Sequence, residues 1–337
     1  MNLIPESNGF KRVNMKRKLS YIQWLKRFMI LIVAIFVFGL VFQIGNYFIG
    51  NEKLKSSLYY AKVNGNKLEY MFKGSGDYTI VFDGSIGTTL YQWDELAQDI
   101  RDELGVKTFV YNRKGYGFSD IGEYRTPAEQ AEDLKILLRK AGVTGKLILV
   151  GEEYGSLIMN SFAEKYPDIV SGVVLINPIS KELLSSDEFH KEIKKKYYKS
   201  KVESIGTYFG LTILMDKLDW DITISEFEDN LSEQVKSEFE IQKDRSSYRR
   251  AIESEIKSLY EYTDNFPKDG ILEDKPLYII CNNDYGNDLT VLGSNELTTV
   301  YSIDSSSNLL STSNKESVKT GISKVIKECK KIEKLKK

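Results

Sequence analysis

The chain has 337 residues, of which 42% are hydrophobic and 28% charged, so it is long enough to bury one sizeable core. The formal net charge of −1 conceals two basic ends, because residues 1–50 hold seven Lys/Arg and one acid, and residues 321–337 hold seven Lys and two Glu. The body between them is therefore acidic, which argues against a nucleic-acid-binding protein. We expect the basic C-terminal tail to be the solvated end of a helix.

Residues 28–49 contain no formal charge, and a helix of this length, at ~1.5 Å per residue, crosses the ~30 Å hydrocarbon layer of a membrane. The apolar run exceeds the ~7–15 residues of a signal-peptide core and no small-residue cleavage site follows it. We therefore predict an uncleaved signal anchor, the alternative being a cleaved signal peptide with a long core. The basic residues before the span place residues 1–27 in the cytoplasm and residues 51–337 outside the cell. Three aromatic residues are expected at the membrane interfaces: Trp24, Tyr47 and Phe48.

After this span, short apolar runs alternate with helical patterns. Residues 58–63 and 67–72 flank Asn64-Gly65-Asn66 and predict a β-hairpin. Further strands are expected at residues 78–82, 106–111, 146–150, 172–176, 276–281 and 297–303. Helices are expected at residues 90–104, 127–142, 154–166 and 316–331. Thr126 and Glu129 form a capping-box pattern around Pro127, which marks one helix start. Strands that alternate with helices predict a mostly parallel sheet covered on both faces.

The pattern changes in residues 180–269, where charged helical stretches replace the apolar strands. This change predicts an inserted helical cap, with an α/β core made of residues 51–179 and 270–337. Two cysteines, Cys281 and Cys329, fit an extracellular domain that does not depend on disulfides. No Cys/His cluster is present, so we expect neither a zinc site nor a cofactor.

Residues 151–155 read Gly-Glu-Glu-Tyr-Gly between an apolar strand and a helical pattern. Three more segments precede this pentapeptide in order: IVFDGSIGTTLYQWDEL, FVYNRKGYGFSD and RTPAEQAEDLKILLRKAGV. Together they resemble the α/β-hydrolase superfamily, specifically its membrane-anchored Gram-positive members, over about residues 57–330. The second segment is similar to the family's Tyr-Asp-Arg-x-Gly-x-Gly-x-Ser motif, with Asn112 in place of Asp. The resemblance implies an α/β-hydrolase fold with a helical cap.

The resemblance also assigns the catalytic positions. Glu152 and Glu153 stand where the family often has His-Ser, so Glu153 holds the nucleophile position of the elbow. The acid position is Asp284, and the general-base position is Asn308, or Ser307 if the alignment slips by one residue. Asn177 stands where some relatives have a second acid. The oxyanion turn and the elbow turn are assigned to Gly84, Ser85, Gly151, Tyr154 and Gly155. The chain's one histidine, His190, lies in the predicted cap, where we expect a solvated helix residue.

Acyl transfer by this fold needs a nucleophile, a base and a group that orients the base, and two of these three are replaced. We therefore hypothesise a catalytically degenerate, membrane-anchored protein that binds a small molecule or a protein partner. One alternative is an active hydrolase of small esters, lactones or peptides that uses Glu153 with Asp284, or a relocated Ser85 or Ser156. A second alternative is a membrane-tethered scaffold recognised through its acidic cap. Glu152 and Glu153 near Asp284 suggest a cationic ligand or a metal ion only weakly. The alternative is that Glu152 and Glu153 are two tolerated substitutions in an unused site.

Overall fold

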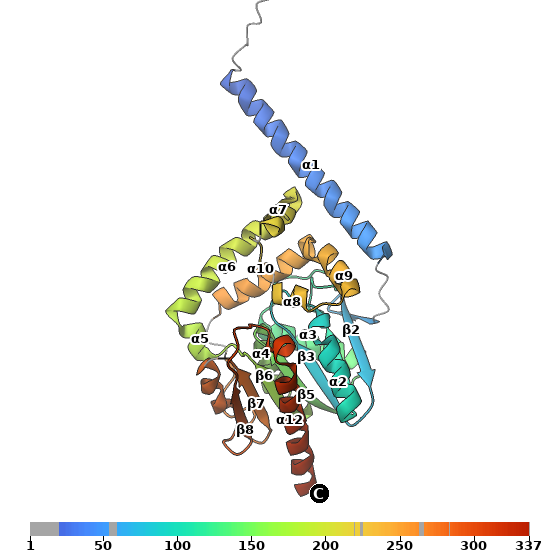
Figure 1. Ribbon diagram of the computed structural model, residues 1–337, viewed down its shortest axis with the longest axis vertical. Coiled ribbons are helices and arrows are strands. Elements are labelled where there is room, and N and C mark those ends of the chain that lie inside the picture. The colour runs from blue at the N-terminus through green and yellow to red at the C-terminus, as the bar shows by residue number, and fades with distance from the viewer. Residues whose placement is uncertain are drawn as a thin grey trace, which may run out of the picture.

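The computed structural model describes the chain in six stretches: residues 20–53, 59–218, 220–222, 225–262, 266–282 and 284–336. A sheet with helices on both faces forms the body, and the helix α1 (Tyr21–Lys53) projects from it (Figure 1). This helix contains the predicted span 28–49 and begins before it. The predicted cytoplasmic residues 1–19 lie outside the described stretches, as does the side chain of Tyr47.

Eight strands form one sheet in the order β1-β2-β4-β3-β5-β6-β7-β8. Their bounds are β1 Tyr59–Val63, β2 Asn66–Gly74, β3 Tyr78–Asp83, β4 Lys107–Tyr111, β5 Lys146–Glu152, β6 Val170–Ile176, β7 Leu277–Cys281 and β8 Thr298–Ser302. The β1–β2 and β2–β4 pairs are antiparallel and the others parallel, which confirms the predicted sheet. The chain runs from β3 to β4 on one side and then to β5 on the other. The carboxyl ends of β3 and β5 therefore meet at a switch point, where open α/β sheets bind ligands.

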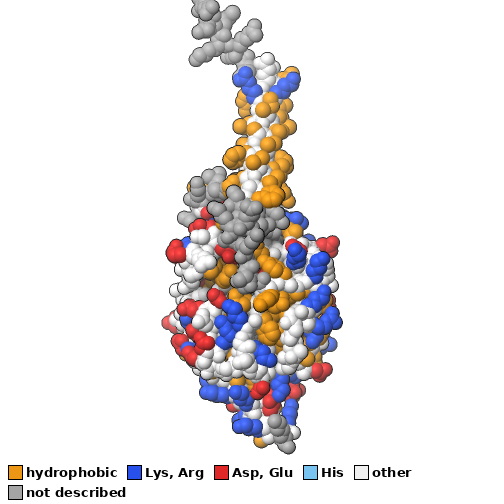
Figure 2. All heavy atoms as spheres, turned by 90° about the vertical axis from the view of Figure 1, so that its right-hand side faces the viewer, with side chains coloured by type: hydrophobic (Ala, Val, Ile, Leu, Met, Phe, Trp, Pro, Cys, Tyr) orange, Lys and Arg blue, Asp and Glu red, His pale blue; other side chains and the backbone are white. Residues whose placement is uncertain are grey.

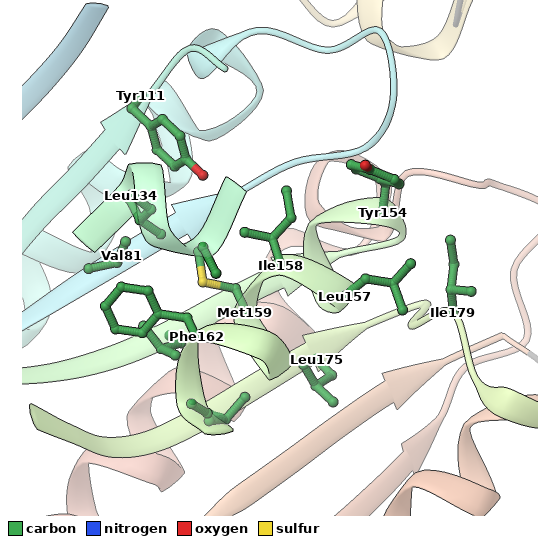
Figure 3. Packing of buried hydrophobic residues seen from close by; sticks show 14 of the residues in the cluster. Val81, Tyr111, Leu134, Tyr154, Leu157, Ile158, Met159, Phe162, Leu175 and Ile179 are labelled. Carbon is green, nitrogen blue, oxygen red and sulfur yellow. The ribbon is translucent and has the colours of Figure 1, made fainter. Parts of the chain in front are cut away.

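Four helices cover the two faces of the sheet. The helices α2 (Asp94–Leu104) and α12 (Lys315–Leu335) share one buried cluster with inward residues of the strands. The helices α3 (Pro127–Lys140) and α4 (Tyr154–Lys165) share the other. Figure 3 shows the second cluster, in which Leu157, Ile158 and Phe162 of α4 lie beside residues of the strands. Full burial of each such side chain stabilises the fold by about 1.5–3 kcal/mol, so α4, and the elbow that starts it, are fixed by packing.

Among the described residues between 181 and 260, the regular elements are helices and no strand is present. The elements of this region are α5 (Lys181–Ser185), α6 (Asp187–Gly206), η3 (Thr207–Phe209), α7 (Leu211–Lys217), α8 (Ser225–Asp229), α9 (Glu233–Lys243) and α10 (Ser246–Tyr260). α6 and α10 pack against each other. A fully buried Arg249 ties the cap together, because its guanidinium pairs with Glu203 at 3.1 Å and Asp221 at 3.0 Å. We refer to these elements together as the cap.

Two local features differ from or refine the expectations. The predicted helix 90–104 divides into a 3-10 turn, η1 (Leu90–Trp93), and α2. At the start of η1 the Asn112 side chain accepts the Leu90 N–H at 2.7 Å. The two cysteines are buried in different clusters, Cys281 with the α4 side of the sheet and Cys329 with the α12 side. The sheet therefore separates the two thiols, and they form no disulfide.

Candidate functional site

The elbow between β5 and α4 has the geometry of a nucleophile turn. Glu153 follows the last residue of β5 with φ 48° and ψ −113°, a backbone conformation that side-chain-bearing residues rarely adopt. The Glu153 N–H donates to the Ile176 carbonyl at 3.0 Å, and the Gly155 N–H donates to the Gly84 carbonyl at 3.1 Å. These bonds tie the turn to β6 and to the loop after β3. The central side chain of the pentapeptide is thereby raised over the carboxyl edge of the sheet.

The two glycines of the pentapeptide are required by close backbone contact. A Cβ on Gly151 would lie 2.7 Å from the Gly155 carbonyl oxygen. A Cβ on Gly155 would collide with the carbonyl of Asp83, at the end of β3. The glycine spacing that predicts the elbow therefore reflects the contact between β5, α4 and the turn after β3.

The Glu153 carboxylate lies half-buried beside the turn after β3. Burial raises the pKa of Glu153, and this effect outweighs the lowering by the Lys196 ammonium, the Ser85 hydroxyl and the Ile86 N–H. The Ser85 hydroxyl lies near the Glu153 carboxylate and lowers its pKa. It forms no hydrogen bond of standard geometry with a described residue. Glu153 therefore lies at the predicted oxyanion turn, where an N–H group and a hydroxyl favour its anionic form.

A buried arginine holds that turn in place. The Arg113 guanidinium donates to the carbonyls of Gly84 and Ser85, each at 2.9 Å. It also pairs with Asp83 and, at 2.6 Å, with Glu255 of the cap helix α10. The arginine of the family-like motif therefore links the core to the cap through the oxyanion turn.

Two tyrosines continue the link between the cap and this turn. The Tyr116 hydroxyl accepts the Gly87 N–H at 3.1 Å and donates to Glu255 at 2.6 Å. The Tyr248 hydroxyl of α10 donates to the Gly87 carbonyl at 2.6 Å. Burial raises the pKa of Tyr116, so its hydroxyl stays protonated and remains a donor. These bonds fix the turn over residues 84–87 and bind the cap to it.

At the predicted general-base position, three asparagines join the ends of neighbouring strands. The Asn177 amide donates to the Asn308 carbonyl at 3.2 Å and accepts the Asn282 N–H at 3.1 Å. The Asn282 amide donates to the Ser307 carbonyl at 3.1 Å. Asn308 itself is exposed. Asp284 begins the short helix η4 (Asp284–Leu292), but its side chain lies outside the described residues, so the acid position stays a prediction.

A carboxylate of the cap covers the same loop. One oxygen of Glu226, on α8, accepts the Asn308 N–H at 3.0 Å and the Leu309 N–H at 3.3 Å. It also accepts the Ser307 hydroxyl at 3.1 Å. Glu226 thus joins the loop of the predicted general-base position to the cap, and we call this contact the Glu226 latch.

Glu152 and Glu153 are adjacent in sequence but lie in different environments. Glu152 is fully buried, and its carboxyl group accepts Gln92 Nε2 at 2.5 Å and the Ser311 N–H at 3.2 Å. Burial raises the pKa of Glu152 to about 7, against the lowering by the Ser311 donors. Glu152 therefore joins η1, the elbow and the helix α11 (Leu310–Ser313) inside the core. Among the described residues, no cluster of three or more His, Cys, Asp or Glu is placed to hold a metal ion.

The other candidate nucleophile and base residues are used structurally. The Ser156 hydroxyl donates to the Glu153 carbonyl at 2.5 Å and accepts the Ile179 N–H at 3.1 Å. It thereby closes the first turn of α4. His190 is exposed on α6, and its ring stacks on Tyr260 with centroids 5.5 Å apart.

A cavity of about 240 Å³ lies between the core loop 111–125 and α10. Its walls include Arg113, Lys114, Tyr124, Asp133, Arg250 and Glu255. Glu153 is not among the lining residues, so this cavity lies beside the elbow and not over it. It shares Arg113 and Glu255 with the network that holds the oxyanion turn.

Residues 78–214 match the family model described as alpha/beta hydrolase fold. This protein has the α/β-hydrolase fold. Among similar solved structures, a putative epoxide hydrolase from Pseudomonas aeruginosa has a TM-score of 0.64 at 12% identity, covering 82% of this chain and 97% of the other. The enol-lactonase from Burkholderia xenovorans LB400 has a TM-score of 0.59 at 16% identity, and the match covers 80% of this chain and 100% of the lactonase. At such identities these structures support the fold alone.

Two curated relatives match parts of this α/β-hydrolase-fold protein. The uncharacterized protein YqjL of Bacillus subtilis is 35% identical over 129 residues, which are 37% of this chain and 50% of the relative. The cis-3-alkyl-4-alkyloxetan-2-one decarboxylase of Shewanella oneidensis is 28% identical over 118 residues, which are 34% of this chain and 36% of the decarboxylase. The chain thus spans half or less of the length of these relatives. The resemblance to the α/β-hydrolase superfamily is confirmed.

Three residues of the site of this α/β-hydrolase-fold protein are not predicted from the sequence. Arg113 belongs to a family-like motif, and that motif was the one available signal of its role. Glu226 and Glu255 lie in charged stretches of the cap, where nothing separates a carboxylate that contacts the core from one that faces solvent. Only the packing of the cap on the core brings them to the site.

Proposed function

We propose that this membrane-anchored α/β-hydrolase-fold protein binds a ligand or a partner and does not turn over a substrate. The observation that carries the proposal is the pair of side chains at the catalytic positions, a carboxylate at 153 and an amide at 308. Neither the amide of Asn308 nor, if the alignment slips by one residue, the hydroxyl of Ser307 takes a proton at neutral pH, so no general base stands at the position expected for the family's histidine. Loss of triad members leaves only about 10³–10⁴-fold catalysis over water.

The cavity beside the elbow supports binding between core and cap. Its lining carries both charge signs, which suits a polar or zwitterionic small molecule. The Arg113–Glu255 pair in its wall also holds the oxyanion turn, so a ligand there would contact the network that joins cap and core. A protein partner recognised through the cap is consistent with the same loss of catalytic groups, and the sequence-based scaffold hypothesis remains within this proposal.

The test uses the full-length protein in detergent or nanodiscs, beside a Glu153→Ala variant. Both proteins are assayed with a panel of chromogenic esters and lactones and with a broad serine-hydrolase probe. We expect no turnover and no labelling in either protein. A Glu153→Ser/Asn308→His variant serves as the positive comparison, because it restores a nucleophile and a base on the same backbone. Turnover in the wild type that Glu153→Ala abolishes would overturn the proposal.

A second candidate function is covalent capture by the carboxylate, and the raised elbow position of Glu153 favours it. A Glu153 oxygen would attack an epoxide carbon, the C–O bond would open, and the released alkoxide would take a proton from water. Without a base to activate water, the resulting ester would persist. Intact-mass spectrometry after incubation with a small epoxide distinguishes the two functions. A single adduct on the wild type, absent from Glu153→Gln, would favour capture over simple binding.

A further inference from the structure

The apolar helix α1 makes a defined contact with the cap. It packs against η3 and α9. The Phe36 ring meets the Phe209 ring edge-on, with centroids 5.3 Å apart. Gly39 leaves no room for a Cβ against the Tyr208 carbonyl, so the two backbones touch. Along the rest of its length α1 presents hydrophobic side chains to the outside (Figure 2).

The position of this contact along α1 sets how deep the cap would lie in a membrane that α1 crosses. The stretch Tyr21–Phe42 is long and apolar enough to cross a membrane. Gly39 lies three residues before the end of that stretch and ten residues before the end of the predicted span 28–49, which is about 4.5 Å and about 15 Å at ~1.5 Å per residue. Elements that lie in a membrane interface bury their apolar faces about 5–10 Å deep. With either end of the span, η3 would therefore lie in the outer half of the ~30 Å hydrocarbon layer that α1 crosses.

The cap carries an apolar face at this place that no described residue covers. On α6, Tyr198, Val202 and Ile205 are exposed by 55%, 47% and 62%, and their spacing of four and three residues puts them on one side of the helix. Ile193 and Tyr197 on the opposite side are buried. α6 therefore has two apolar sides, one packed in the cap and one that ends at η3, where Phe209 touches α1.

A second apolar segment lies beside α6. Leu218 and Trp220 follow α7 and are exposed by 65% and 58%. The segment runs beside α6, because the Lys199 ammonium donates to the Asp221 carbonyl at 3.0 Å. We call Tyr198, Val202, Ile205, Phe209, Leu218 and Trp220 the docking face. Tyrosine and tryptophan are the residues enriched at membrane–water interfaces.

Lysines lie on the same side of α6, farther from α1. Lys191, Lys194 and Lys195 precede Tyr198 by seven, four and three residues, and all three are exposed. Within the described residues none of them forms an ion pair. Lys195 lies about 15 Å along the helix axis from Ile205, at ~1.5 Å per residue. The apolar end of α6 thus lies next to the membrane helix, and the lysines follow farther along the same helix. This order suits acyl chains and then anionic headgroups.

We propose that the cap docks on the same bilayer that α1 crosses, with the docking face in the lipid interface and the three lysines on anionic lipid headgroups. The proposal rests on membrane anchoring by α1. Because the cap also holds the oxyanion turn through Glu255 and Tyr248, docking would hold the elbow toward the lipid surface.

The test places an environment-sensitive NBD dye on single introduced cysteines of the full-length protein in lipid vesicles. The native cysteines are both buried and give little background. Ile205→Cys reports the docking face, Val33→Cys reports insertion of α1, and Ser75→Cys, exposed on a loop of the core, is the matched control. The vesicles are phosphatidylcholine with or without phosphatidylglycerol, and quenchers are carried on the lipid chains. We expect quenching at 205 and 33, and none at 75.

The outcomes separate the inference from the anchoring on which it rests. Quenching at 33 without quenching at 205 would overturn cap docking and leave anchoring intact. No quenching at residue 33 would overturn both membrane anchoring by α1 and docking of the cap. A blue-shifted but unquenched dye at 205 would mean that another protein surface, such as a second copy, covers the face, and would also overturn the inference.

The charge requirement is tested independently. A Lys191→Gln/Lys194→Gln/Lys195→Gln variant, combined with the dye at 205, loses three charges from α6. We expect quenching on phosphatidylglycerol vesicles to fall at least twofold. The same three-charge loss at Lys330, Lys331 and Lys334 of α12 should leave quenching unchanged, and equal effects of the two variants would contradict a specific role of α6.

Discussion

Among the individual residues, Glu153 combines an unusual backbone with an unusual side chain. A positive φ costs a side-chain-bearing residue about 1–3 kcal/mol, and Gly avoids this cost. Glu153→Gly removes both the strain and the carboxylate, whereas Glu153→Ala removes only the carboxylate. We therefore expect the Gly variant to be more stable than the Ala variant by about 1 kcal/mol, after the entropy that Gly gains on unfolding. Urea unfolding of both full-length variants measures this difference, and a less stable Gly variant would mean that the elbow is not strained.

Glu152 makes a second prediction for a single residue, on pH dependence. Burial raises its pKa from 4.5 to about 7. The folded state then binds more protons than the unfolded state between these two values, so stability falls as the pH rises from about 4.5 to 7 and levels off above. The loss from this one group is roughly 3 kcal/mol.

The measurement compares thermal unfolding of the wild type and Glu152→Gln across this pH window and about one unit above it. We expect the wild type to lose stability relative to the variant as the pH rises. Burial also raises the pKa of Glu238 to about 7, so Glu238→Gln is the matched control and should retain the loss due to Glu152. Parallel profiles of the wild type and Glu152→Gln would show that Glu152 does not titrate there.

Between secondary-structure elements, the Glu226 latch joins α8 of the cap to the loop after β8. Glu226→Ala leaves the Asn308 and Leu309 N–H groups without their carboxylate acceptor. Hydrogen bonds to a charged group contribute about 1.5–3 kcal/mol, which corresponds to roughly 10- to 100-fold faster amide exchange. We expect this increase at the Asn308 amide by hydrogen–deuterium exchange, and a smaller one at Leu309, whose N–H also donates to the Ser307 hydroxyl at 3.1 Å, while the β3 amides stay unchanged. Glu228→Ala, on the same short helix but bonded to Lys243 within the cap, is the matched control.

For the molecule as a whole, the apolar helix α1 could span a membrane, and its orientation would then decide on which side the body lies. The basic residues that precede the span predict an N-terminus in the cytoplasm and a body outside the cell. A membrane-impermeant maleimide on intact cells should label Ser75→Cys and leave Ser7→Cys unlabelled until the cells are lysed. The reverse pattern would mean an inverted orientation, and labelling of neither residue would place the body inside.

The elements and the fold class follow from the sequence alone. The alternation of apolar strands with helical patterns, the capping box at Thr126 and the glycines at 151 and 155 express local rules, and the structure contains each of them. The Thr126 hydroxyl accepts the Glu129 N–H at 3.3 Å, as the capping box predicts. Patterns of this kind predict the structure correctly because each depends only on residues that are a few positions apart in the chain.

Which charged residues form the site depends on the tertiary structure. Arg113 and Glu255 are separated by 142 positions, yet they pair with each other, and Arg113 donates to the carbonyls of the oxyanion turn. Glu226 accepts the N–H of Asn308, 82 positions away, in the loop of the predicted base position. The tertiary structure also separates Glu152, inside the core, from Glu153, beneath the cap, and it places the exposed side of α6 next to α1. A charged residue in a helical pattern looks alike in the sequence in two cases: when its side chain faces solvent, and when it pairs with a residue far away in the chain. The two cases differ only in the folded protein, where burial and pairing set the free energy needed to keep the charge out of water.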